Sequence, residues 1–147
     1  MYIERHIEDV ILKAHETFPS LLVTGPRQIG KSTVLKTMFP NYTQDQLDDL
    51  SLQRAIKTDP LGYLKLKGTP IIIDEIQKVP ELFSSIKYVV DKEHNKGMYL
   101  LTGSQRFQLM KGVSESLAGR IAIINMQGLS LREIYADKFK ESFLPTT

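Results

Sequence analysis

The sequence has no cysteine and no tryptophan, and only three of its 147 residues are histidines. The absence of cysteine excludes disulfides, cysteine-ligated zinc sites and thiol nucleophiles. His6, His15 and His94 are scattered along the chain without the spacing of a metal site. No apolar run approaches the roughly 20 residues of a membrane span, and the charged N-terminus lacks the apolar core of a signal peptide. We therefore expect a cytoplasmic protein with no membrane partner.

A large excess of charge of one sign is also lacking. The 19 lysines and arginines are nearly matched by 17 acidic residues, and a formal net charge of +2 is too small to indicate nucleic-acid binding. No basic stretch with interleaved aromatic residues is present. With 41% hydrophobic and 24% charged residues, the composition is that of an ordinary globular protein. A chain of this length is expected to form one domain.

What the sequence does contain is a phosphate-binding motif near its N-terminus. An apolar run at residues 21–23 leads into a segment that fits the pattern G-x-x-x-x-G-K-[ST] at every fixed position. The backbone N–H groups of such a loop surround an anion, and its glycines stand where a side chain would block the turn or the close approach. The helix that follows adds unpaired N–H groups and the positive end of its dipole. The candidate nucleotide-binding residues are Gly25, Pro26, Arg27, Gln28, Ile29, Gly30, Lys31, Ser32 and Thr33.

Two residues of this motif have specific expected tasks. Lys31 is expected to reach the β- and γ-phosphates of ATP, and the hydroxyl of Ser32 is expected to ligate Mg²⁺. The alternative is a glycine-rich turn between a strand and a helix that binds nothing. The complete motif, in the strand, loop and helix setting that it requires, favours phosphate binding, so ATP and Mg²⁺ are the predicted ligands.

A second candidate site follows the three isoleucines at residues 71–73, which end in Asp74 and Glu75. A carboxylate at the tip of a buried strand is costly unless a cation or hydrogen-bond donors meet it. Beside a phosphate loop, Asp74 is a candidate partner for Mg²⁺. Glu75 is a candidate general base that holds and polarises the attacking water. The alternative is that both carboxylates cap the following turn, but the upstream motif favours the catalytic interpretation.

Two weaker signals lie later in the chain. Ser104 and Gln105 follow a predicted strand at 98–102, where either could orient the attacking water, although an N-cap of the next helix explains Ser104 equally well. Arg120 directly precedes another predicted strand. It could be an ordinary solvated surface charge. Equally, it could be an arginine finger, a residue that stabilises transition-state charge in a neighbouring subunit of a homo-oligomer.

The apolar periodicity predicts strands that alternate with helices. Such alternation indicates a parallel α/β sheet covered on both faces, with a ligand at the carboxyl ends of its strands. The strand at 42–47 is weakly apolar and is expected at an edge. The segment 103–119 is expected to be helical in two pieces, interrupted at Gly112. The predicted strands are 20–24, 42–47, 71–73, 98–102 and 121–126, and the predicted helices are 3–14, 31–39, 50–58, 60–67, 81–94, 103–119 and 131–139.

With these signals combined, the chain resembles ATPases of the AAA+ class. The stretches GPRQIGKST, PIIIDEIQKVPELF, YLLTGSQ and SESLAGRIAI resemble one prokaryotic branch, in which the AAA domain precedes a C-terminal domain of unknown function. This likeness covers about residues 2–135. It implies a P-loop NTPase fold of the AAA+ (ASCE) type, with three α/β/α layers and a parallel five-stranded sheet of order 5-1-4-3-2. The site residues that it implies are Lys31 and Ser32 for nucleotide and metal, Asp74 and Glu75 for metal and water, Ser104 or Gln105 as the sensor, and Arg120 as the candidate finger.

The resemblance also implies a division of the chain. Residues 1–128 correspond to the AAA+ ATPase core, and residues 129–147 to the start of a truncated C-terminal extension that lacks the helical lid and the C-terminal domain. We expect a missing domain or a protein partner to receive the energy of hydrolysis. DNA as an effector rests on analogy alone.

The leading prediction is therefore Mg²⁺-dependent ATP binding and hydrolysis. A nucleotide-dependent conformational switch with little turnover is the second interpretation. A small-molecule phosphotransferase on the same fold fits less well, because the six arginines form no cluster that could clamp an acceptor.

Overall fold

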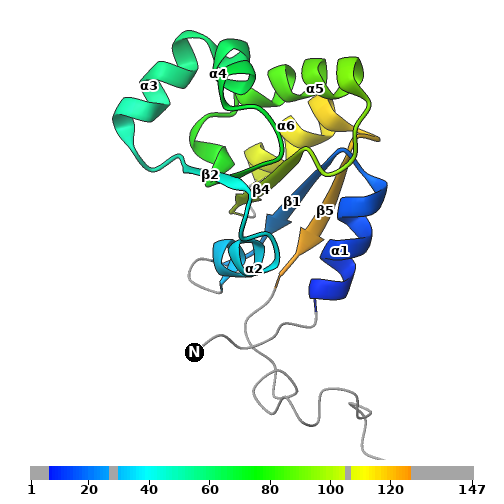
Figure 1. The fold of residues 1–147 in the computed structure, drawn as a ribbon. Helices are drawn as coiled ribbons and strands as arrows, with labels where there is room; N and C mark the ends of the chain where they lie inside the picture. Colours follow the sequence, from blue (N-terminus) through cyan, green and yellow to red (C-terminus); the bar gives the residue numbers. More distant parts are fainter. Residues whose placement is uncertain (1–6, 27–29, 105–106, 127–147) are drawn as a thin grey trace, which may run out of the picture.

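The computed structural model describes residues 7–26, 30–104 and 107–126, and their strands form one parallel sheet. Five strands pair in the order β2-β3-β4-β1-β5, and every pair is parallel. Read from the other edge, this is the predicted order 5-1-4-3-2, which is thereby confirmed (Figure 1). The strands are β1 (Ser20–Thr24), β2 (Thr43–Gln46), β3 (Ile71–Asp74), β4 (Tyr99–Gly103) and β5 (Ile121–Asn125).

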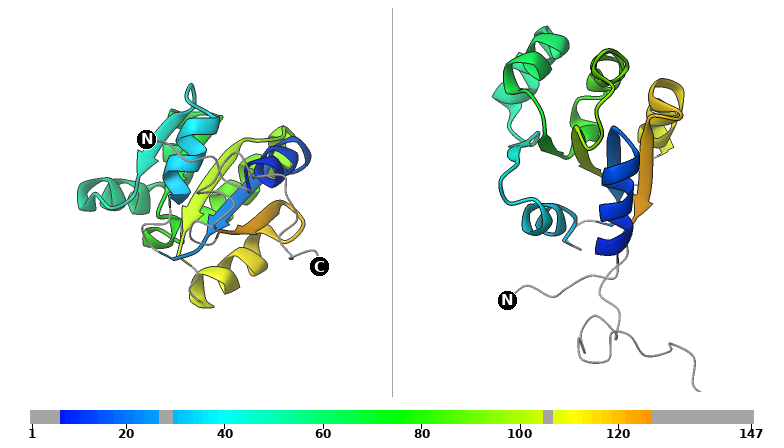
Figure 2. Two further views of the ribbon diagram at one scale, coloured as in Figure 1. Left: turned by 90° about the horizontal axis from the view of Figure 1, so that it is seen from below. Right: turned by 45° about the vertical axis from the view of Figure 1, so that its right-hand side comes forward.

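Helices cover both faces of this sheet. The left view of Figure 2 shows the sheet between α1 and α2 on one side and α6 on the other. Helical crossovers are needed because parallel neighbours cannot be joined by a tight hairpin. The helical elements are α1 (Glu8–Thr17), α2 (Lys31–Met38), α3 (Leu50–Thr58), α4 (Pro60–Lys67), the 3₁₀ turn η1 (Ile76–Lys78), α5 (Leu82–Glu93) and α6 (Phe107–Leu117).

Alternating side chains of the strands fill two hydrophobic cores. Leu22 and Leu101 belong to the core that includes residues of α3, α4, α5 and α6. Leu21 and Leu100 belong to the core that includes residues of α1 and α2. All residues of β1, β3 and β4 are buried, as expected for strands covered on both faces. Each face of the sheet thus packs against a layer of helices, as the predicted three-layer α/β/α arrangement requires.

The edge position predicted for the weakly apolar strand is confirmed. β2 pairs with β3 alone in the described sheet and none of its four residues is fully buried. Its polar side chains have specific partners. The Asp45 carboxylate accepts a hydrogen bond from the Tyr63 hydroxyl at 2.5 Å and pairs with the Lys67 ammonium at 3.3 Å. These contacts connect the edge strand to α4.

One secondary-structure prediction is wrong. Gly112 does not interrupt a helix, because α6 continues from Phe107 to Leu117. A Cβ atom at Gly112 would lie 3.4 Å from the ring of Phe83 on α5. This is an ordinary van der Waals distance, so α6 packs against α5 at this point without requiring a glycine, and tertiary packing outweighs the low helix propensity of glycine. The predicted helix at 131–139 and the first part of the helix at 3–14 lie outside the described residues.

The strand register brings the carboxyl ends of β1, β3 and β4 to the same edge of the sheet. Thr24 lies opposite Gly103, and Ile73 lies opposite Leu101. β4 lies between β1, which leads into the phosphate-loop motif, and β3, which ends in the acidic pair. Three segments that are far apart in the sequence therefore meet at one edge.

Candidate functional site

The phosphate-loop motif connects β1 to α2. Gly30 has φ 92° and ψ 24°, a left-handed conformation that is costly for a residue with a Cβ atom, and α2 begins at the next residue. The N-cap residue of α2 is this glycine, which has no side chain to cap the helix, and the positive end of a helix dipole favours an anion. Gly25 is buried. Arg27, Gln28 and Ile29 lie outside the described residues.

The ammonium group of Lys31 points back into this loop. Lys31 is only 6% exposed, and its Nζ donates hydrogen bonds to the carbonyl oxygens of Gly25 at 2.7 Å and Pro26 at 3.0 Å. A buried ammonium requires such acceptors. The group has three donors on a flexible stem, so it can exchange these carbonyls for phosphate oxygens without a change in the backbone of α2.

A cavity of about 460 Å³ lies at the carboxyl edge of the sheet. This volume is within the range of small-molecule and cofactor sites. The cavity brings the predicted base, Glu75, together with the phosphate-loop residues. Its lining consists of Gly30, Lys31, Ser32, Thr33, Gln46, Asp48, Glu75, Lys78 and Thr102.

Asp74 is buried at the end of β3, and both of its carboxylate oxygens have donors. It is 2% exposed. Oδ1 accepts from the Thr102 hydroxyl at 3.0 Å, and Oδ2 accepts from the Gln44 amide at 2.6 Å. These donors come from the two strands beside β3, so they stabilise the carboxylate and fix its orientation.

Glu75 leaves the strand in an unusual backbone conformation. Its φ of 62° and ψ of 50° are left-handed, which is uncommon for a residue other than glycine. Its backbone N–H donates to the Thr102 hydroxyl at 3.0 Å, and its side chain makes no capping hydrogen bond to η1. The carboxylate instead accepts from the side-chain amide of Gln77. Capping of the following turn, the alternative raised for this pair, is therefore not what the Glu75 side chain does.

Comparison with known proteins identifies the family of this arrangement. A protein-family model described as "AAA domain" matches residues 17–135. The chain belongs to the AAA domain family. Over 119 residues, 79% of this chain, it is 34% identical to the uncharacterized protein Rv2008c of Mycobacterium tuberculosis and likewise to the uncharacterized protein Mb2031c of Mycobacterium bovis. The aligned region spans 26% of the length of each of these relatives.

Solved structures share the fold of this AAA domain. The Walker-type ATPase PABY2304 of Pyrococcus abyssi superposes with a TM-score of 0.63 at 18% identity, covering 99% of this chain and 60% of that one. The STAND protein PH0952 of Pyrococcus horikoshii, which has a tetratricopeptide repeat sensor, gives 0.58 at 17% identity and covers 98% and 26%. At these identities the likeness shows the fold alone. The prediction of an AAA+ ATPase with a P-loop NTPase fold is confirmed by the family match and the sheet order.

In the AAA domain Ser104 contacts Gln77, two residues after Glu75. Its backbone N–H donates to the side-chain oxygen of Gln77 at 3.3 Å, and its own hydroxyl has no hydrogen-bond partner among the described residues. Ser104 follows β4, which lies between β1 and β3 in the sheet. Gln105, the other sensor candidate, lies outside the described residues, as does the junction that would test the N-cap alternative for Ser104.

Arg120 lies at the amino-terminal ends of the strands, on the side of the sheet opposite to the cavity. The next residue, Ile121, pairs with Ser20 at the start of β1, whereas the phosphate loop follows the end of this five-residue strand, about 15 Å away at about 3.3 Å per residue. The guanidinium Nε donates to Asp91 at 2.6 Å, and this hydrogen bond lowers the pKa of the Asp91 carboxyl. Arg120 therefore cannot serve the cavity of its own chain. A role in a neighbouring subunit would require it to leave Asp91.

Sequence reasoning missed several polar residues around the acidic pair. Thr102 accepts from the Glu75 backbone and donates to Asp74, and Gln44 donates to the same carboxylate. Thr102 is a polar residue near the carboxyl end of an otherwise apolar, buried strand, and this position in the sequence could have indicated a role in the site. Gln44 lies on the edge strand, where polar residues are ordinary, so it gave no such indication.

The residues present fit Mg²⁺ held together with a phosphate-bearing ligand. Among the described residues, no group of three or more acidic or histidine side chains could hold a metal by itself. Mg²⁺ is usually bound through one or two carboxylates, water and substrate phosphates. Ser32 and Asp74 supply hard oxygen ligands of this kind, although both Asp74 oxygens already have donors, so contact through a bound water fits better than direct ligation. In the described part of the chain no helix is both long and apolar enough to span a membrane.

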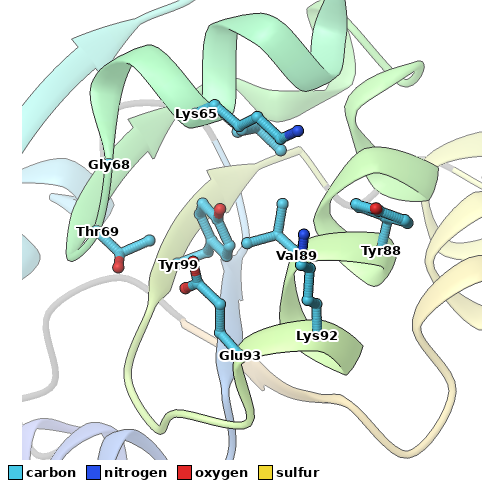
Figure 3. Close-up of a pocket in the computed structure, with 9 residues that line it drawn as sticks. Lys65, Gly68, Thr69, Tyr88, Val89, Lys92, Glu93 and Tyr99 are labelled. Carbon is cyan, nitrogen blue, oxygen red and sulfur yellow. The ribbon is translucent and has the colours of Figure 1, made fainter.

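A second, smaller hollow of about 170 Å³ lies between α4, α5 and the start of β4. Figure 3 shows the ring of Tyr99 reaching between Thr69 and Val89 towards the helix that bears Lys65. Tyr99 is 1% exposed, and its hydroxyl has no partner among the described residues. Burial, together with the negative charge of Glu93, raises the pKa of Tyr99 to about 12, so the phenol remains a neutral donor at physiological pH.

This hydroxyl leads to a prediction about stability. Because the hydroxyl of Tyr99 forms no hydrogen bond with the residues that the structure describes, we expect Tyr99→Phe to leave the free energy of unfolding unchanged or to raise it by up to about 1 kcal/mol. Tyr63→Phe is the matched control, since it breaks the bond to Asp45 and is expected to cost about 1–2 kcal/mol. Urea denaturation measures both. A larger loss for Tyr99→Phe than for Tyr63→Phe would contradict this assignment.

Proposed function

We propose that this chain binds ATP with Mg²⁺ and hydrolyses it, as an AAA+ ATPase core. The observation that carries the proposal is that Lys31, Ser32 and Glu75 line one cavity although Ser32 and Glu75 are 43 positions apart in the sequence. The phosphate loop would hold the triphosphate. Of the acidic pair at the end of β3, Asp74 would help to hold the metal and Glu75 would activate the water.

The phosphates would be held by backbone N–H groups and by one ammonium group. The N–H groups at the start of α2 point to the position of an anion. Lys31 would exchange the carbonyl oxygens of Gly25 and Pro26 for phosphate oxygens. An ammonium group attracts an anionic phosphate oxygen more strongly than a neutral carbonyl oxygen, which favours the exchange when a triphosphate enters.

Ser32 and Asp74 would hold the metal. When bound, Mg²⁺ would bridge phosphate oxygens and neutralise charge that develops on them. Thr102 and Gln44 keep the Asp74 carboxylate oriented towards this edge from both sides. Glu75 would accept a proton from the attacking water, and a carboxylate with one oxygen already fixed is suited to this task. Ser104 or Gln105 would orient the same water.

A nucleotide-dependent switch with little turnover is the second candidate. The buried network around Asp74 would then sense the nucleotide, and hydrolysis would be incidental. Steady-state phosphate release, measured together with ATP affinity, separates the two. We expect turnover that depends on both ATP and Mg²⁺; tight binding with no phosphate release above that of the Glu75→Gln variant would favour the switch.

We further propose that Arg120 acts in a neighbouring subunit. Its position at the edge opposite its own cavity supports a role in trans, in which it would exchange Asp91 for a phosphate of the adjacent chain. Arginine fingers contribute roughly 10³–10⁵ to turnover.

This leads to a prediction that depends on association. Arg120→Ala is expected to lower kcat at least about tenfold at protein concentrations at which subunits associate, and to have no effect in a monomeric sample. Turnover is measured across a dilution series calibrated by light scattering, with Arg54→Ala on α3 as the control. An equal loss in the monomer would remove the finger role.

The proposed core would drive other parts of a longer protein or a separate partner. The relatives are about four times longer than the region that aligns with this chain, so they have room for further domains. In our proposal residues 1–128 form the ATPase core and residues 129–147 begin an extension. We propose that the energy of hydrolysis is coupled to such an appended domain or to a protein partner.

A further inference from the structure

The side chain of Gln77 bridges two parts of the candidate site. It lies in η1, the short turn that follows Glu75. Its amide nitrogen donates to Glu75 Oε2, and its amide oxygen accepts from the backbone N–H of Ser104 at 3.3 Å. The first contact is local, whereas the second joins segments 27 residues apart. A single amide thus connects the candidate base with the end of β4.

We propose that Gln77 is a positioning residue that holds the Glu75 carboxylate in place for its reaction with water. This inference rests on the proposed ATPase function and adds a residue to it. The backbone of Glu75 is already fixed, because its N–H donates to Thr102 and its carbonyl oxygen accepts from the Lys78 N–H at 3.0 Å. The flexible side chain has Gln77 as its hydrogen-bond partner among the described residues.

The arrangement leaves one carboxylate oxygen available. Glu75 Oε2 is bound to the Gln77 amide, and Oε1 accepts no hydrogen bond from the described residues. A carboxylate held through one oxygen keeps the other for water, with few rotamers to lose on reaching the reactive geometry. Catalytic groups require this kind of support, because small displacements of a reacting group reduce rates strongly.

Glutamine is the residue type that this position requires. Only one orientation of the amide satisfies both neighbours, with the nitrogen towards the carboxylate and the oxygen towards the Ser104 N–H. Glutamate has the same length but no N–H to donate. Asparagine has both groups but is one methylene shorter. The bond to Ser104 orients the amide, and the amide in turn orients Glu75.

The test compares variants of Gln77 in steady-state ATP hydrolysis and in ATP binding. Gln77→Ala is expected to lower kcat by roughly 10- to 100-fold, with KM and the Kd for ATP within about twofold of wild type. Gln77→Glu retains the volume but loses the donor, so an equal or larger loss of kcat is expected. Gln53→Ala is the matched control, since it removes a half-buried glutamine whose amide donates to the Leu47 carbonyl oxygen at 2.7 Å.

A double variant separates positioning from a general effect on structure. Because Gln77 acts through Glu75, adding Gln77→Ala to Glu75→Gln should lower single-turnover hydrolysis no further than Glu75→Gln does alone. Additive losses, a loss of kcat shared by Gln53→Ala, or a kcat for Gln77→Ala within twofold of wild type would each overturn the inference. If Gln77→Ala retains a kcat within twofold of wild type while Glu75→Gln is inactive, the inference about Gln77 is wrong but the proposed function still holds. An unchanged Glu75→Gln overturns both.

Discussion

Replacing Glu75 by glutamine is expected to lower kcat by at least about 100-fold while the Kd for ATP stays within about threefold of wild type. The amide cannot accept a proton from water, and general-base catalysis contributes about 10²–10⁴ to rate. Shape and backbone contacts are retained, because the N–H of residue 75 still donates to Thr102. Phosphate release and fluorescent-nucleotide binding measure the two quantities.

The control for this variant is Glu81→Gln. Glu81 is exposed just before α5 and its side chain makes no capping hydrogen bond, so neutralising its charge should leave both quantities unchanged. If Glu75→Gln turns over ATP at the wild-type rate, the assignment of Glu75 as the base is wrong.

The second large effect is expected for Lys31→Ala. Removal of the ammonium deletes charge-assisted hydrogen bonds to the phosphates, each worth about 1.5–3 kcal/mol, so the Kd for ATP should rise by about 10- to 150-fold. The carbonyl oxygens of Gly25 and Pro26 also lose their donor. Equilibrium binding of ATP with Mg²⁺ measures the change in Kd. Thermal unfolding without nucleotide shows whether the loss of the two loop hydrogen bonds destabilises the fold.

Lys36→Ala is the matched control for Lys31→Ala. Lys36 is exposed in the last turn of the same helix, so its removal changes the net charge equally without touching the loop. If both variants raise the Kd for ATP equally, the affinity depends on charge at a distance and not on the contact of Lys31 with the loop.

Much of the fold follows from local sequence patterns. The run of isoleucines before Asp74 could only be a buried strand, and the low apolar content around Gln44 indicated an edge. Predicted and observed strand ends differ by at most one residue because turn signals bound each strand on both sides. Gly112 shows where a local pattern is insufficient. A glycine weakens a helix locally, yet α6 continues through it where it packs against Phe83 of α5.

The candidate site could be predicted in part. The phosphate loop and the acidic pair have local signatures, and the cavity brings Glu75 of that pair together with Lys31 and Ser32 of the loop. Thr102 and Gln44 were not found, because their contacts with Asp74 depend on how the strands pair. The register of β3 with β4 brings Thr102 to Asp74. Gln44 pairs with Ile72 on β3, and its side chain extends from there to the Asp74 carboxylate. Gln77 was missed for a similar reason, since its partner Ser104 lies 27 residues away in the sequence, directly after β4.

Calorimetric titration of the wild-type chain with ATP and Mg²⁺ tests the central claim most directly. If the loop between β1 and α2 holds a triphosphate, one ATP should bind per chain with measurable heat, and the heat should fall sharply with Lys31→Ala but not with Lys36→Ala. A folded wild-type chain that gives no heat at millimolar ATP with Mg²⁺ would contradict the account.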